Sequence, residues 1–317
     1  MTVSISAQEV GFVCAFALLG LLIGSFLNVL VHRLPRIMER QWQAELAAAA
    51  TTAATGAAPH SPSLPAPPTY SLLSPRSHCP GCGHVLGWHE NIPGLSYIAL
   101  RGRCSACKGR ISPRYPLVEL ATALLFAWCA TRAGSAQLPT ALAWSGFCAV
   151  LLALALIDWD TTLLPDSLTQ PLLWAGLGGA AIGWTGTTLV DAFWGAATGY
   201  LSLWLLATIY HWITGREGMG HGDFKLLAAL GAWLGWAALP PLLLLASSLG
   251  ALVGLVLLGR RRAPTRATEN EPAQEVPLYI PFGPFLAVAG LALMALGHAT
   301  FFAALGLKLS DLALMLK

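Results

Sequence analysis

The chain has 317 residues, of which 56% are hydrophobic and only 10% are charged, and its mean hydropathy is +0.63. Soluble proteins carry about 25% charged residues, so this composition excludes an ordinary soluble domain. The formal net charge of +3 is small and gives no reason to expect nucleic-acid binding. We therefore expect an all-α polytopic membrane protein in contact with the lipid bilayer.

Eight apolar runs predict about eight transmembrane helices, because crossing a hydrocarbon core of roughly 30 Å takes about 20 residues. The first run has no basic segment before it and is followed by "HRLPR", which indicates a retained helix rather than a cleaved signal peptide. Pro240 and Pro241 are expected to form a tight turn between the sixth and seventh runs. The predicted spans are 10–31, 116–134, 138–157, 167–186, 189–211, 224–239, 240–259 and 279–303.

Lysine and arginine are distributed unevenly between the two sides that these spans define. With the N-terminus outside, fifteen basic residues fall in or next to the inside loops and three fall on the other side. Because cytoplasmic loops are enriched in Lys and Arg, both termini are predicted to be periplasmic. The basic residues are thus interpreted as topological anchors.

The loop 32–115 is polar and long enough to fold by itself. Its first part is rich in Ala and then in Pro, which indicates a short interfacial helix followed by a linker at about 40–75. Its second part, 76–115, contains paired cysteines. We expect a first helix at 1–31, this cytoplasmic loop with its module, and a seven-helix membrane core at 116–317.

Four of the seven cysteines form two C-x2-C pairs separated by 21 residues. This spacing is typical of a tetrahedral four-thiolate zinc site in a zinc-ribbon-like loop, with two disulfides as the alternative. His78 and His84 flank the first pair and are alternative ligands or solvated loop residues. A closed four-thiolate shell predicts a structural metal, with ligands Cys79, Cys82, Cys104 and Cys107.

Aspartates cluster at the ends of the apolar runs on the inside face. Asp158 directly follows an apolar run, and an ionisable group at such depth is a functional candidate. Asp160 is expected to be an exposed turn residue, and Asp166 an N-cap. Asp223, in "GMGHGDFK", is either a helix cap or one half of an acid–base pair with Asp158. In the second reading, the glycines around Asp223 provide room for a substrate backbone.

Several motifs, in order along nearly the whole chain, resemble those of the prepilin peptidases, the type IV leader peptidases of pilus assembly and type II secretion. The Ala/Pro-rich stretch near 46–75 has no counterpart. The motifs are "GSFLNVLVHRLP" (24–35), the two C-x2-C pairs around "WHENIP", "RYPLVEL" (114–120), "IDWDTTLLPD" (157–166), "GMGHGDFKLLAALGAWLG" (218–235) and "PFGPFLA" (281–287).

The resemblance implies an inner-membrane aspartic peptidase of the GxGD type that removes a short basic leader from type IV prepilins or pseudopilins at the cytoplasmic face. It implies Asp158 and Asp223 as the catalytic pair, with His221 at the variable GxGD position, and zinc at the four cysteines. Many members then methylate the new N-terminus with S-adenosylmethionine. Glu90 and Glu119 mark the candidate region for this cofactor, although a structural role is the alternative for both.

Two further points stay open at this stage. In the "GSFLNVLVHRLP" motif, Gly24 and Ser25 favour close helix packing, and Asn28 needs a hydrogen-bond partner on a neighbouring helix or on the substrate. The rival functions are a proton-coupled transporter with a regulatory zinc module and a non-enzymatic membrane scaffold. The lack of Gly/Pro-broken inverted repeats counts against a transporter.

Overall fold

The computed structural model describes residues 6–55, 70–216, 218–261 and 280–297. Within these ranges the secondary structure is helical, apart from two isolated antiparallel bridges, which confirms the all-α class. The chain divides into two compact units, Met1–Ala149 and Val150–Lys317. The α-helices are α1 (Ala7–Thr55), α2 (Leu95–Ala99), α3 (Arg114–Ala133), α4 (Leu138–Thr161), α5 (Asp166–Ala181), α6 (Leu189–Thr214), α7 (His221–Leu234), α8 (Leu239–Arg261) and α9 (Gly283–Leu296).

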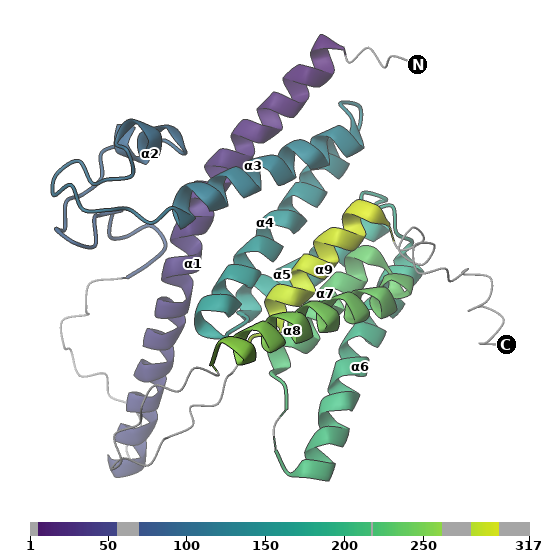
Figure 1. Ribbon diagram of the computed structural model, residues 1–317. Helices are drawn as coiled ribbons and strands as arrows, with labels where there is room; N and C mark the ends of the chain where they lie inside the picture. The colour runs from purple at the N-terminus through teal and green to yellow at the C-terminus, as the bar shows by residue number, and fades with distance from the viewer. Residues whose placement is uncertain (1–5, 56–69, 217, 262–279, 298–317) are drawn as a thin grey trace. The chain divides into compact units, whose positions relative to one another are not determined.

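In the first unit, α1 packs along α3 (Figure 1). The helices approach so closely that a Cβ atom on Gly24 would lie 2.6 Å from Glu119 Cα. The Asn28 side-chain amide donates to the carbonyl of Tyr115, at 3.1 Å. The expectation that this motif serves helix packing is therefore confirmed, because Asn28 finds its partner on a neighbouring helix.

The polar module between α1 and α3 contains the short helix α2, a 3₁₀ turn η1 (His89–Asn91) and two cysteine loops. Each loop is closed by backbone hydrogen bonds, such as Cys79 N–H to His84 O and Cys104 N–H to Gly109 O, both at 2.9 Å. The residue after each second cysteine is left-handed: Gly83 has φ +73° and Lys108 has φ +60°. The two loops thus have matching backbone geometry, although a lysine in one occupies the position of a glycine in the other.

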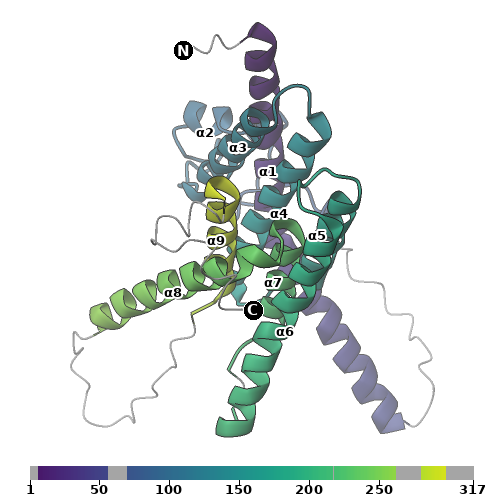
Figure 2. The same cartoon turned by 90° about the vertical axis from the view of Figure 1, so that its right-hand side faces the viewer.

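In the second unit, α7 packs against α5, α6, α8 and α9 (Figures 1 and 2). The backbones of α6 and α7 touch where Gly195 faces Gly231, and a Cβ atom on Gly199 would lie 2.8 Å from Leu227 O. On the α5 side, the indole N–H of Trp233 donates to the Leu172 carbonyl at 2.8 Å. Helix α7 is consequently buried along almost its whole length.

Helices occur at all eight predicted runs. Among the residues that the structure describes, five helical segments are long and apolar enough to cross a membrane: α1, α3, α4, α6 and Trp236–Gly259, which contains most of α8. The others are short: 16 residues of α5 extend about 24 Å and 14 residues of α7 about 21 Å, at 1.5 Å per residue. The count of eight spans therefore stays a prediction. The last predicted run, 279–303, lies partly outside the described residues, as does part of the 40–75 linker.

Two helix ends differ from expectation. Helix α1 runs without interruption to Thr55, past Pro35 and well beyond the predicted span. Pro240 and Pro241 lie in the first turn of α8, not in a turn between helices, because proline fits the first helical turn, where its missing N–H costs nothing. The chain reverses earlier, at Gly235, whose φ is +81°.

Candidate functional site

Asp158 lies in the last turn of α4 and is only 4% exposed. Its carboxylate accepts a hydrogen bond from the backbone N–H of Gly283, at 3.0 Å. Gly283 is the first residue of α9, where backbone N–H groups have no partner within the helix. A Cβ atom on Gly283 would lie 2.6 Å from Asp158 Oδ2, so only glycine fits this position without a shift. Gly283 lies in the "PFGPFLA" motif, but its contact with Asp158 was not predicted from the sequence.

Asp223 lies in the first turn of α7 and is 7% exposed. The helix cap is Gly220, which makes no side-chain capping bond, so the reading of Asp223 as an N-cap is wrong. The helix begins at His221, three residues before the predicted start at Phe224, which places the carboxyl group inside the first turn. Asp158 and Asp223 are close enough to interact electrostatically. The structure therefore brings these two predicted residues together.

Leu164, in the turn between α4 and α5, packs against the start of α7, which carries Asp223, and against the start of α9, whose Gly283 binds Asp158. A Cβ atom on Gly222 would lie 2.7 Å from Leu164 Cβ, and one on Gly283 would lie 3.3 Å from Leu164 Cδ1. The absence of a side chain at Gly222 is thus explained by Leu164 rather than by space for a substrate. Likewise, a Cβ atom on Gly218 would lie 2.6 Å from the ring of Tyr210. The expectation that these two glycines make room for a substrate backbone is therefore not supported.

The other two acids near the site have different roles. Asp160 is exposed, as predicted, but it lies in the last turn of α4 and not in the turn after the helix, because α4 continues to Thr161. Asp166 is the first residue of α5 and not its N-cap, which is Pro165. Both carboxylate oxygens of Asp166 lie 2.7 Å from Lys225 Nζ. This ion pair joins α5 to α7 next to Asp223. It was not predicted from the sequence, because Lys225 was counted there only as a topological anchor.

The four paired cysteines converge in the module of the first unit, with all Sγ atoms within 4.8 Å of one another. The sulfurs of Cys79 and Cys107 are 3.9 Å apart, and those of Cys82 and Cys104 are 4.0 Å apart. Tetrahedral coordination with Zn–S bonds of 2.3 Å places sulfurs about 3.8 Å apart. The cysteines are free thiols and are too far apart for disulfides, so the cluster is compatible with a structural metal.

The flanking histidines do not belong to this cluster. His78 Nδ1 lies 3.0 Å from the carbonyl of Arg76, and His84 Nε2 lies 3.2 Å from Glu90 Oε2. Both rings thus have partners in the loop backbone or side chains. The alternative in which they replace cysteine ligands finds no support.

Glu90 is used inside the module. The Ser105 hydroxyl and the Gly87 N–H, which donates at 2.7 Å, lower the pKa of the Glu90 carboxyl to about 2, with His84 contributing further. Ser105 lies in the second cysteine loop, while Gly87 and His84 belong to the segment after the first. Glu90 therefore links the two halves of the module.

Glu119 is also engaged. It is 8% exposed and accepts a hydrogen bond from the N–H of Gly94 at 2.8 Å, with a second contact from the Ser25 side chain. Gly94 directly precedes α2, and Ser25 belongs to α1. Glu119 thus joins three helices, which is the structural role that was predicted as the alternative to cofactor binding.

Comparison with known proteins gives two family matches. Residues 18–133 match the bacterial peptidase A24 N-terminal domain, and residues 145–255 match the type IV leader peptidase family. The first match contains the four paired cysteines, and the second contains Asp158 and Asp223. The two compact regions thus correspond to two family domains.

Curated relatives cover most of the chain. A Burkholderia pseudomallei protein named prepilin leader peptidase/N-methyltransferase is 50% identical over 92% of this chain and 88% of its own length. Proteins of the same name from Pseudomonas aeruginosa and Aeromonas hydrophila are both 48% identical, over 90% and 86% of this chain and 91% and 87% of their own lengths. No solved structure matches the chain significantly.

Proposed function

Because the chain belongs to the type IV leader peptidase family, we propose that it is a multi-pass inner-membrane aspartic endopeptidase that removes the leader from type IV prepilins or pseudopilins and then methylates the new N-terminus. The relatives named above support both activities. The observation that carries the peptidase assignment is the buried pair Asp158 and Asp223. The family gives no support to the transporter and scaffold alternatives.

In the proposed mechanism, the two aspartates act on one water molecule and one peptide bond. One carboxylate accepts a proton from the water, whose oxygen attacks the scissile carbonyl, while the other carboxyl donates a proton to the carbonyl oxygen. Collapse of the tetrahedral intermediate breaks the C–N bond, and the leaving amine takes up a proton. The Gly283 N–H holds the Asp158 carboxylate in place during these steps.

The substrate is proposed to approach along the bilayer. A prepilin carries an apolar helix after its basic leader, so the helix enters the membrane and leaves the cleavage site at its edge. The fifteen-to-three distribution of basic residues supports a cytoplasmic active site with both termini in the periplasm. A cytoplasmic site agrees with a leader that is cleaved before export.

Zinc is the metal that best fits the cysteine cluster. Two sulfur pairs are 3.9 and 4.0 Å apart and all four sulfurs lie within 4.8 Å of one another, close to tetrahedral coordination, and four thiolate ligands leave no coordination position for water. The proposed role is structural: Cys79, Cys82, Cys104 and Cys107 would hold zinc and stabilise the module. No catalytic step is assigned to it.

The S-adenosylmethionine site stays a prediction. Glu90 and Glu119 are the candidate acids, and both already accept hydrogen bonds from backbone N–H groups of the module. These contacts favour a role in shaping the module over direct contact with the methyl donor. When bound, the cofactor would supply the methyl group for the amine that proteolysis releases.

The proposal is tested with purified protein in detergent and a prepilin substrate. Asp158→Asn and Asp223→Asn should each abolish cleavage, while Asp160→Asn, a change in the same helical turn, should retain it. Mass measurement of the product with and without S-adenosylmethionine tests methylation separately. Full cleavage by either catalytic variant would refute the acid-pair mechanism.

A further inference from the structure

The cysteine module exposes large apolar side chains that no part of the module covers. Leu95 and Ile98 are 67% and 74% exposed and lie three residues apart on α2, so they share one side of that helix. Trp88, just before η1, is 79% exposed. Exposed apolar groups concentrated in one small domain indicate a surface that contacts another apolar phase.

The position of α2 in the first unit indicates that this apolar phase is the lipid bilayer. Gly94, directly before α2, donates to Glu119 of α3, and Glu119 in turn lies against Gly24 of α1. Gly24 and Glu119 both fall inside the predicted spans 10–31 and 116–134. Helix α2 therefore starts beside the inner half of these two predicted spans, at a depth where the bilayer is in reach.

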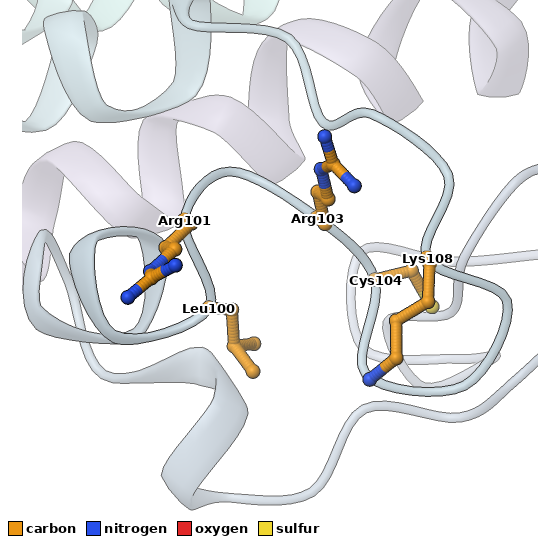
Figure 3. A pocket seen from close by; sticks show the side chains of 5 residues that line it. All are labelled: Leu100, Arg101, Arg103, Cys104 and Lys108. Atoms are coloured by element: carbon orange, nitrogen blue, oxygen red, sulfur yellow. The ribbon is translucent and has the colours of Figure 1, made fainter.

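Cationic side chains surround the loop that follows α2. A pocket of about 290 Å³ is lined by Arg101, Arg103 and Lys108, together with Leu100 and Cys104 (Figure 3). A second pocket of about 480 Å³ shares Arg101 and Arg103 and adds Arg110. All four basic side chains are exposed.

The charge of the module is strongly one-sided. Residues 76–115 contain six basic residues and one acidic residue, Glu90. The Glu90 side chain is only 8% exposed and is engaged with Gly87 and His84, so it does not offset the surface charge. The exposed surface of the module thus carries both positive charge and apolar side chains, and proteins that combine the two bind anionic lipid surfaces.

We infer that the cysteine module is docked on the surface of an anionic bilayer. Leu95, Ile98 and Trp88 enter the headgroup–acyl boundary, and the pocket formed by Arg101, Arg103 and Lys108 binds the phosphate of a phospholipid headgroup. The module is then a peripheral membrane domain that lies flat beside α1 and α3. This inference concerns the module alone and does not depend on the peptidase mechanism.

The test uses the full-length, metal-loaded protein in nanodiscs of phosphatidylcholine alone or with phosphatidylglycerol added. Hydrogen–deuterium exchange should be slower for the amides of 95–103 when phosphatidylglycerol is present. Each of the single substitutions Arg101→Gln and Arg103→Gln should reduce that protection about fivefold. Ile98→Gln should reduce it in both lipids.

The controls separate docking from folding. Arg132→Gln, a change at the other end of α3, should leave the protection intact, and equal metal content in all variants would show that the module is folded. Equal exchange in both kinds of nanodisc, or protection unchanged by the Arg101 and Arg103 substitutions, overturns the inference. It is also overturned if inorganic phosphate in detergent protects these amides as well as the anionic bilayer does, because the site would then bind the anion without the membrane.

Discussion

The cysteine module and the aspartate pair are both clusters of reactive side chains, but they are assembled in opposite ways. The four cysteines lie within 29 positions, Cys79–Cys107, and their loops are closed by local hydrogen bonds. Asp158, Asp223 and Gly283 come from three helices and span 126 positions, Asp158–Gly283. The first cluster depends on local turns and, as proposed, on a metal, whereas the second depends on helix packing. Perturbing one should therefore leave the other largely intact.

The largest effect is expected from removing either acid. Asp158→Asn or Asp223→Asn should lower prepilin cleavage by about 10²–10⁴-fold, the contribution of general acid–base catalysis. Metal content and the thermal melting temperature should stay at wild-type values. A cleavage assay with Asp160→Asn as the matched control measures this, and a comparable loss in the control would contradict the assignment.

The second-largest loss of cleavage is expected from Gly283→Ala. The new Cβ atom would lie 2.6 Å from Asp158 Oδ2 and would displace the carboxylate. A shift of this kind costs about 10²-fold in rate, because the catalytic groups lose alignment. Steady-state kinetics should show the loss in kcat. Gly178→Ala, where a Cβ meets nothing within 4 Å, is the control and should behave as wild type.

Metal removal should affect only the cysteine module. Chelation, or Cys104→Ser, should abolish protection of the module amides against hydrogen exchange, because a closed thiolate site supplies much of the folding free energy of a small domain. Helices α5–α9 should retain their protection. Loss of protection in both regions at once would show that the two are thermodynamically coupled.

Gly24→Ala tests helix packing in the first unit. Its Cβ would lie 2.6 Å from Glu119 Cα, and overpacking of this kind costs about 1–3 kcal/mol. The thermal melting temperature in detergent should fall. Gly11→Ala, where a Cβ meets nothing within 4 Å, should leave the melting temperature unchanged. Equal stability of the two variants would mean that α1 and α3 separate readily.

The smallest effect is expected for Lys225→Gln. The ion pair with Asp166 is partly exposed, with the two side chains 29% and 60% accessible, so its loss should cost at most about 1 kcal/mol. The double variant Lys225→Gln/Asp166→Asn should be no less stable than either single variant. Additive losses in a double-mutant cycle would contradict direct pairing.

The difference in assembly also explains what could be predicted from the sequence. The metal ligands follow from C-x2-C spacing alone, and the helices follow from apolar length. The contacts of Leu164 and Gly283 could not be predicted, because they join segments whose separation in sequence carries no periodic signal. The predicted capping roles of Asp166 and Asp223 were wrong, because the sequence pattern of an acid at the N-cap is the same as that of an acid in the first helical turn. Helix lengths were also mispredicted where polar residues continue a helix, as in α1, or where a glycine stops it, as at Gly235 in α7.

The glycine contacts between α6 and α7 have a mechanical consequence. Where Gly195 meets Gly231 and Gly199 meets Leu227, backbone rests on backbone with no side chain to act as a flexible spacer. Trp233 fastens the same helix to α5. Close backbone contacts and this hydrogen bond therefore fix α5, α6 and α7 against one another, so the packing of these three helices sets the position of Asp223. Asp158 is positioned separately, by the end of α4 and by the N–H of Gly283 on α9.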